Sequence, residues 1–298
     1  MKDHIDIYAL DISKLPINVT ISTMSATCSL GVDVDLSNIY NYMILNKKSI
    51  TTIKYKGEIK SLEKQSKRKR KKNVKSFQNQ LTVEIRPDIE KLPDNKISIK
   101  IFKNGSIQMS GVKSLLACNL ALNKLIDSLT KEYGVIVDGK IEDIHFISDT
   151  DKISVNRYKV DMINSNFNIN YEVNRESLYN ILLERKIECR YEPSIHACVN
   201  IKFRPPNAPK NISIFVFQSG HIIITGAKNI DNIAESYKYI TNMLEEHKSN
   251  IEKSKIADIL FDNMNDELRE LLKVDDDDNL AKIASVSYTH LTLPTTGS

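Results

Sequence analysis

The sequence predicts an α+β fold built from two imperfect repeats, each with a strand, a short helix, further strands and a longer helix. Three observations predict it: an internal repeat, a hairpin pattern in each copy, and opening strands with one polar face. The segment Ser98–Lys113, SIKIFKNGSIQMSGVK, aligns without a gap on Ser213–Lys228, SIFVFQSGHIIITGAK, 115 positions later. Such a repeat decides the architecture before any local pattern does.

Each copy contains a hairpin followed by a helix. β-Branched and aromatic residues alternate on either side of an Asn-Gly pair in the first copy and a Ser-Gly pair in the second, which is typical of a tight turn. Apolar residues then recur at helical spacing over Leu115–Leu129 and over Ile233–Leu244.

The matching extends upstream of the hairpins. LTVEIRP at 81–87 matches VNIKFRP at 199–205, and VDLSNIYN at 34–41 matches VNRESLYN at 173–180. The second pair indicates the beginning of a short helix in each repeat.

The opening strand of each repeat alternates polar and apolar residues. The polar sets are Thr23, Ser25, Thr27 and Ser29 in the first repeat and Asn164, Asn166, Asn168 and Asn170 in the second. A period of two with one polar face indicates a sheet packed on one side only. We therefore expect helices on the apolar face and an open polar face.

The predicted organisation has five parts. They are repeat 1 over 16–133 with a basic insertion at 47–75, a connector over 134–156, repeat 2 over 157–247, a helical and acidic tail over 248–285, and a non-native or disordered tail over 286–298. Within the helical tail, a helix is expected over Ile251–Lys273.

The basic character of the chain lies in one segment. Residues 47–75 hold thirteen Lys or Arg against two Glu, a local charge of +11 in a chain of net charge +4. We expect this insertion to lack a packed core. Its string SKRKRKKNVK, at 66–75, is interpreted as a DNA-binding arm, a nuclear import signal or a solvated loop.

Several functional classes are disfavoured. No stretch approaches the roughly 20 apolar residues that cross a bilayer, and the start lacks a secretory pattern, so an intracellular protein with no membrane partner is expected. The four cysteines have neither zinc nor disulfide spacing and are expected to be buried thiols, and no cofactor or metal is predicted. The enzymatic alternative is a metal-dependent nuclease that uses Glu142, Asp143, Asp149 and Asp151.

Three strings resemble a known family. FQSGHIIITGAK at Phe217–Lys228 resembles the second-repeat hairpin of the TATA-box-binding protein family, and YEP at Tyr191–Pro193 precedes it as in that family. ATCSLG at Ala26–Gly31 resembles the first strand of the first repeat. The resemblance covers roughly residues 16–247, and the basic insertion and Asn-rich strand are more similar to divergent relatives encoded by large nucleocytoplasmic DNA viruses.

The resemblance implies a TATA-box-binding-protein-like saddle: two pseudo-symmetric repeats form one curved antiparallel sheet, with helices on the convex face. It implies a non-enzymatic general transcription initiation factor that binds and bends AT-rich double-stranded promoter DNA through the minor groove. The implied partners are a transcription factor IIB-like protein and the RNA polymerase machinery, in the nucleus or a cytoplasmic viral factory of an infected host. The alternative is a saddle-shaped protein-interaction module that has lost DNA binding.

The resemblance also implies which residues contact DNA. Phe102 and Phe217 occupy the positions of inserting phenylalanines. His196 matches the second aromatic of the wedge in repeat 2, and Phe77 or Gln78 matches it in repeat 1.

The groove floor departs from the family at its two central asparagines, which are replaced by Thr23 and Met162. Thr27 and Asn164 are candidate donors to adenine N3 and thymine O2. The other floor candidates are Ser25, Gln108, Ser110, Asn166, Ile223 and Thr225. Arg86, Lys202 and Arg204 are candidates for phosphate contacts, and Glu192, Ser194 and Ile195 for the IIB-like partner.

Overall fold

The structure is a computed structural model that describes residues 12–63, 78–87, 95–137 and 139–253. The chain divides into two units, Met1–Glu252 and Lys253–Ser298. All elements named below lie in the first unit.

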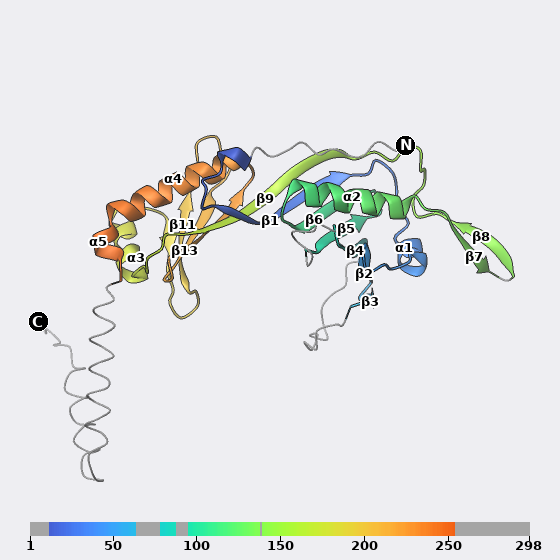
Figure 1. Ribbon diagram of the computed structural model, residues 1–298, viewed down its shortest axis with the longest axis horizontal. Helices are drawn as coiled ribbons and strands as arrows, with labels where there is room; N and C mark the ends of the chain where they lie inside the picture. The colour runs from blue at the N-terminus through green and yellow to red at the C-terminus, as the bar shows by residue number, and fades with distance from the viewer. Residues whose placement is uncertain (1–11, 64–77, 88–94, 138, 254–298) are drawn as a thin grey trace, which may run out of the picture. The chain divides into compact units, whose positions relative to one another are not determined.

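The two repeats follow each other along the chain, separated by a small hairpin (Figure 1). Repeat 1 contains η1 Ile12–Lys14, β1 Thr20–Ser29, α1 Leu36–Tyr42, β2 Ile50–Tyr55, β3 Glu58–Ser61, β4 Gln80–Ile85, β5 Ile97–Phe102, β6 Ser106–Val112 and α2 Leu115–Leu129. The hairpin is β7 Tyr133–Val137 and β8 Lys140–Ile144. Repeat 2 contains β9 Asn156–Asn168, α3 Arg175–Glu184, β10 Cys189–Arg190, β11 Cys198–Phe203, β12 Ile212–Phe217, β13 His221–Ala227, α4 Ile230–Glu246 and α5 Lys248–Ile251.

The strands of both repeats form one eleven-stranded antiparallel sheet. Its order is β10-β11-β12-β13-β9-β1-β6-β5-β4-β2-β3, so the opening strands of the two repeats meet in the middle. The pair β7–β8 is a separate two-stranded sheet. The predicted fold class is confirmed, and the strands of Thr23 and Asn164 lie at the centre of the sheet.

The strand registers define a pseudo-two-fold axis. Every residue pair between β1 and β6 has an equivalent pair between β9 and β13. The β9 residue lies 139 positions after its β1 equivalent, and the β13 residue lies 115 positions after its β6 equivalent. Met24 paired with Val112, for example, is equivalent to Ile163 paired with Ala227. Because Met24 also pairs with its own counterpart Ile163 between β1 and β9, the axis passes through that pair. The central strands are thus related by an offset of 139 and the hairpins by 115.

The helix caps follow the same two offsets. Asp35 caps α1 by accepting from Asn38 N at 2.8 Å, and Asn174, 139 positions later, caps α3. Ser114 caps α2 and Asn229, 115 positions later, caps α4. Short polar side chains at these positions satisfy amides that the first helical turn leaves unpaired, each worth about 1 kcal/mol.

The helices cover one face of the sheet, where the core lies. Alternate strand residues such as Ile99, Ile101, Ile214 and Val216 are fully buried there, together with the apolar side chains of α2 and α4. Burial raises the pKa of Cys28 to about 12 and that of Cys118 to about 11, so these two thiols are neutral and inaccessible. Cys189 and Cys198 are only half-buried, so the prediction of four buried thiols is wrong for two of them.

Two boundary predictions need correction. The sequence predicts a basic insertion over 47–75 without a packed core, but Ile50–Tyr55 and Glu58–Ser61 form β2 and β3, because Ile50 and Ile53 supply buried side chains to the core. Residues 64–75 lie outside the described residues. The helix expected over Ile251–Lys273 does not continue through Glu252, which forms a β-bridge with Val173. The rest of that expected helix lies outside the described residues. The predicted connector includes the hairpin of β7 and β8. Among the helices of the described residues, none is long and apolar enough to cross a membrane.

Gly105 and Gly220 allow the two hairpins to approach the strand-to-helix loops. Both have positive φ, +73° and +76°, and an added Cβ would lie 2.2 Å from the carbonyl oxygen of Val32 or of Tyr171. The glycine carbonyls accept hydrogen bonds from Leu30 N and Ile169 N. Each turn is thereby fixed against its own repeat.

Replacing either glycine with alanine should destabilise the fold by about 3 kcal/mol or more, because left-handed strain of about 1–2 kcal/mol adds to a forced backbone shift. Gly139→Ala is the matched control, since its φ is +79° but nothing lies within 4 Å of the added Cβ. Denaturant unfolding should show a much smaller effect for the control. Equal losses for all three variants would show that φ alone matters.

Candidate nucleic-acid interface

The sheet face opposite the helices carries mostly polar side chains. Around the centre it presents Thr23, Ser25, Thr27, Asn164, Asn166, Asn168, Gln108, Ser110, Ile223 and Thr225, whose neighbours in each strand point into the core. We call this surface the open face. It brings together the floor residues that the sequence predicts, from β1, β6, β9 and β13.

Phe102 and Phe217 lie on the open face, one near each hairpin turn. In β5 and β12 they follow the fully buried Ile101 and Val216, so their side chains point away from the core. Both rings are half-buried rather than fully exposed. The ring of Phe217 lies 6.3 Å from that of His221, which gives it a partner on the neighbouring strand.

The expected second wedge residues are only partly placed. Phe102 pairs with Gln80 in repeat 1, and Phe217 pairs with Cys198 in repeat 2. Gln80 and Cys198 are therefore equivalent residues, 118 positions apart. The same offset makes Gln78 the counterpart of His196. Both residues are exposed. Phe77, the other candidate, lies outside the described residues.

The polar centre is hydrogen-bonded within itself. Thr225 donates from Oγ1 to Asn164 Oδ1, and Asn166 accepts from Thr20 Oγ1 at 3.0 Å. Met162 lies beside them with 36% of its surface exposed. Thr27 differs from expectation, because its hydroxyl oxygen is buried and has no hydrogen-bond partner among the described residues.

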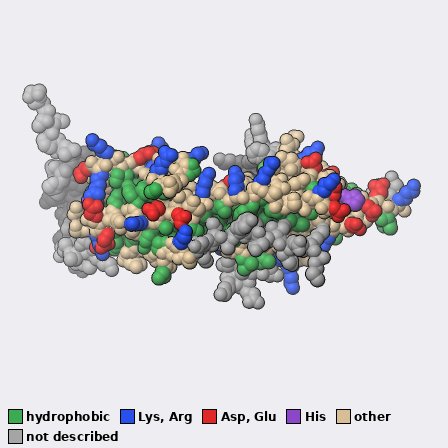
Figure 2. Space-filling view, turned by 90° about the horizontal axis from the view of Figure 1, so that it is seen from above, with side chains coloured by type: hydrophobic (Ala, Val, Ile, Leu, Met, Phe, Trp, Pro, Cys, Tyr) green, Lys and Arg blue, Asp and Glu red, His purple; other side chains and the backbone are tan. Residues whose placement is uncertain are grey.

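The open face is less acidic than the helical face. On the side of α2 and α4, Asp, Glu, Lys and Arg are interspersed (Figure 2). Two open-face carboxylates, Glu84 and Asp161, are each paired with a lysine, Lys54 and Lys159. At the counterpart of Glu84, Lys202 donates to the hydroxyl of Ser213 at 2.6 Å, so repeat 2 retains a positive charge there.

The two predicted phosphate-binding arginines are held by their own repeats. Arg86 pairs with Glu63 at 2.9 Å, and hydrogen bonds from Lys96 and Arg86 lower the pKa of Glu63. Arg204 donates to the carbonyl of Ala208 at 3.2 Å and is otherwise exposed. Of the three predicted cations, Lys202 lies among the polar residues of the open face.

The loop between β10 and β11 presents the predicted partner surface. Glu192, Ser194 and Ile195 are all exposed, Ile195 by 66%. Arg175 of α3 holds the loop by donating to the carbonyl of Ala197 at 2.7 Å and lies over the ring of Tyr191.

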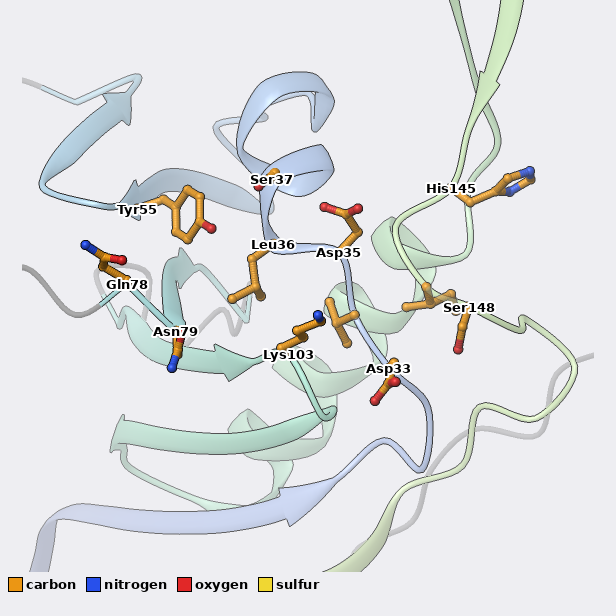
Figure 3. Close-up of a pocket in the computed structure, with 12 residues that line it drawn as sticks. Asp33, Asp35, Leu36, Ser37, Tyr55, Gln78, Asn79, Lys103, His145 and Ser148 are labelled. Atoms are coloured by element: carbon orange, nitrogen blue, oxygen red, sulfur yellow. The ribbon is translucent and has the colours of Figure 1, made fainter.

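A pocket of about 510 Å³ lies beside the first-repeat hairpin (Figure 3). Gln78, Tyr55 and Lys103 line it from the sheet, with Asp35 and His145 on the other side. Asp35 Oδ1 is engaged as the cap of α1. Within the described residues no cluster of three His, Cys, Asp or Glu has the geometry to hold a metal ion.

Sequence reasoning missed several open-face residues. Lys100, Phe215, Asn200 and Arg190 share the face with the predicted set, as their strand partners show. Alternation in SIKIF and SIFVF would have identified Lys100 and Phe215, because each is two residues before a predicted phenylalanine. Arg190 is in a two-residue strand too short to show a pattern.

Comparison with known proteins identifies the class. The family model described as "Transcription factor TFIID (or TATA-binding protein, TBP)" matches residues 157–247. A TATA-box-binding protein-like chain of Acanthamoeba polyphaga mimivirus is 36% identical over 251 residues, covering 78% of this chain and 67% of that one. The TATA-box-binding protein of Sulfolobus acidocaldarius is 28% identical over 169 residues, 55% of this chain and 74% of that one. The solved Methanococcus jannaschii TBP covers 77% of this chain and 99% of its own, at 20% identity and a TM-score of 0.48.

Architecture and sequence relationships together define a two-repeat sheet protein of a transcription-factor family. The chain belongs to the TATA-box-binding protein family. Its match to a viral member over most of its length agrees with the viral relatives that the sequence predicts.

Removing an open-face phenylalanine should cost less stability than truncating the buried residue before it. Ile101→Ala and Val216→Ala should each lose about 2–4 kcal/mol, because they leave cavities in a closed core. Phe102→Ala and Phe217→Ala should each lose about 1 kcal/mol or less, since their rings have solvent on one side. Thermal or denaturant unfolding measures the difference, and phenylalanine variants that unfold like the core variants would place these rings in the core.

Proposed function

We propose that the protein is a transcription initiation factor that binds AT-rich double-stranded DNA in the minor groove through its open face and bends it. The observation that carries the proposal is the pair Phe102 and Phe217, which are related by the pseudo-two-fold axis and both turned away from the core. A phenylalanine kept out of a core forgoes part of the 1.5–3 kcal/mol that its burial supplies. Insertion between base steps provides a compensating use.

The chemistry of the open face supports a minor-groove target. Hydroxyl and amide groups at the centre match the adenine N3 and thymine O2 acceptors of that groove. Lys202 and Lys100 add positive charge for phosphates, which positions the protein without reading sequence. A broad, nearly carboxylate-free sheet with two aromatic ends suits a wide, bent duplex better than a small ligand.

The affinity for an AT-rich duplex should exceed that for a GC-rich one and fall with salt. Phe102→Ala and Phe217→Ala should each weaken binding by about tenfold, as lost phenylalanine burial implies, and should reduce bending measured by fluorescence transfer between labelled duplex ends. Leu116→Ala is the control, because this residue is 60% exposed on α2, away from the open face.

Thiol labelling locates the interface in the same experiment. Cys198 pairs with Phe217 on the open face, whereas Cys189 packs toward the core side, and both are half-buried. DNA should slow alkylation of Cys198 and leave Cys189 unchanged. Absence of binding to any duplex would contradict the proposal and favour a protein-interaction module.

We extend the proposal to a transcription factor IIB-like partner, and through it the RNA polymerase machinery, in the nucleus or viral factory of an infected host. The loop between β10 and β11 supports this, because Arg175 braces it through the carbonyl of Ala197 and Ile195 offers an exposed apolar anchor beside Glu192 and Ser194. An ordered apolar side chain within a polar rim is typical of protein interfaces.

The double variant Glu192→Arg/Ile195→Ala should bind DNA with unchanged affinity but fail to form a ternary complex with a IIB-like factor in a mobility-shift assay. The expected loss is at least tenfold, about 1.4 kcal/mol, as for an interface anchor. Leu183→Ala, 50% exposed on α3, is the control. An unchanged ternary complex in the double variant would show that the partner binds elsewhere.

A further inference from the structure

The centre of the open face is chemically asymmetric although its backbone is symmetric. The offsets that define the pseudo-two-fold axis make three pairs of counterparts: Thr23 with Met162, Ser25 with Asn164, and Ser110 with Thr225. Because Thr23 pairs with Asn164 and Ser25 with Met162, these residues form two rows on either side of the axis. One row is Thr23, Asn164 and Thr225, and the other is Met162, Ser25 and Ser110.

Asn164 is the one amide in these rows, and a neighbour orients it. Thr225 Oγ1 donates to Asn164 Oδ1, so the amide oxygen is engaged within the protein. Asn164 Nδ2 makes no hydrogen bond to any described residue, and the side chain is half-exposed on the open face. The adjacent Asn166 contrasts with it, because its Oδ1 accepts from Thr20 and its Nδ2 donates to Ser22. Asn164 therefore presents a directed donor, while Asn166 is satisfied at both ends.

The row of Met162, Ser25 and Ser110 presents no donor with a fixed direction. Serine hydroxyls both donate and accept, and Ser25 and Ser110 are free to rotate toward either kind of group. Met162 occupies the position of Thr23 with a thioether, which donates nothing. This row accommodates a base pair of either kind.

We propose, on the basis of the DNA-binding function above, that Asn164 oriented by Thr225 selects an A·T pair on one side of the DNA centre only. An A·T pair offers only acceptors in the minor groove, whereas a G·C pair adds the guanine N2 amino donor. Asn164 Nδ2, held in place by Thr225, would face that amino group with no acceptor between the two donors, which disfavours a G·C pair. The row of Ser25 tolerates G·C, so the interface reads the two halves of a site differently and a site with one G·C pair fixes the orientation of the protein.

The test uses three duplexes with a palindromic A·T core: unsubstituted, with one G·C pair on one side of the centre, and with a G·C pair on both sides. One G·C pair should lower the affinity of the protein only about twofold, because the protein can still bind in the orientation that places the row of Ser25 against that pair. A G·C pair on both sides should lower the affinity roughly tenfold, which is in the usual range for one unfavourable base pair.

Variants locate the effect. Asn164→Ser copies Ser25, the counterpart in repeat 1, and should reduce the affinity loss caused by G·C pairs on both sides to about twofold. Thr225→Val should have the same effect, because it frees the amide of Asn164 to rotate. The matched gain-of-function variant Ser25→Asn/Ser110→Thr should make the first substitution cost roughly tenfold. Unfolding temperatures establish that the variants remain folded.

Equal costs for the first and second substitution in the unmodified protein, or a penalty unchanged in Asn164→Ser, would overturn this inference while leaving DNA binding intact. Failure to bind the unsubstituted duplex would instead overturn the proposed function, and this inference with it.

Discussion

The antiparallel pairing of β1 with β9 is the contact on which the rest of the structure depends. The other pairings of the large sheet, apart from β1–β6 and β9–β13, join strands that are near neighbours along the chain, whereas β1–β9 joins residues some 140 positions apart. Without it each repeat would expose a long central strand, the kind of edge that invites aggregation. With it, the free edges of the sheet are β3 and β10, of four and two residues.

Pseudo-symmetry has been kept where packing demands it and lost where packing does not. Most counterparts on the core face remain apolar, as with Met24 and Ile163 or Ile107 and Ile222, whereas Ser165 is a small buried polar residue at the position of Ala26. A close-packed interior tolerates only substitutions of similar volume and polarity. The open face has no such constraint, and there Glu84 corresponds to Lys202 and Gln108 to Ile223. Two similar frames thus carry two different chemistries.

The sequence predicted what short-range periodicity and internal repetition determine. The hairpins and the polar face of the opening strands followed from spacing, because the two-residue period fixes which side chains share a face. The limits lay where tertiary pairing overrides composition. A high density of lysines hid β2 and β3, whose few buried side chains, Ile50 and Ile53, are enough to place them in the sheet. The hairpin β7–β8 had a signal that was overlooked, the Asp-Gly pair at 138–139 between alternating residues.

Hydrogen-bond partners could not be predicted at all, because they depend on which strands meet. That Arg86 pairs with Glu63, and that Thr225 orients Asn164, follow from neighbours 23 and 61 positions away. The family resemblance marked Arg86 as a candidate for phosphate contacts, whereas its ion pair in the folded chain already uses part of its donor capacity.

The two ends of the sheet differ for a reason visible in one pair of counterparts. Arg175 begins α3 and fixes the loop of Tyr191 and Ile195 through Ala197 and Gln218. Its counterpart at the start of α1, 139 positions earlier, is Leu36, which is buried and has no side-chain donor. Where the arginine bridges loop and hairpin in repeat 2, repeat 1 has the pocket lined by Leu36 and Lys103, the counterpart of Gln218. A preorganised loop binds a partner with less loss of conformational entropy. The repeat-2 end thus carries a braced loop where the repeat-1 end has a pocket, and this difference supports the proposed partner site on the loop of Ile195.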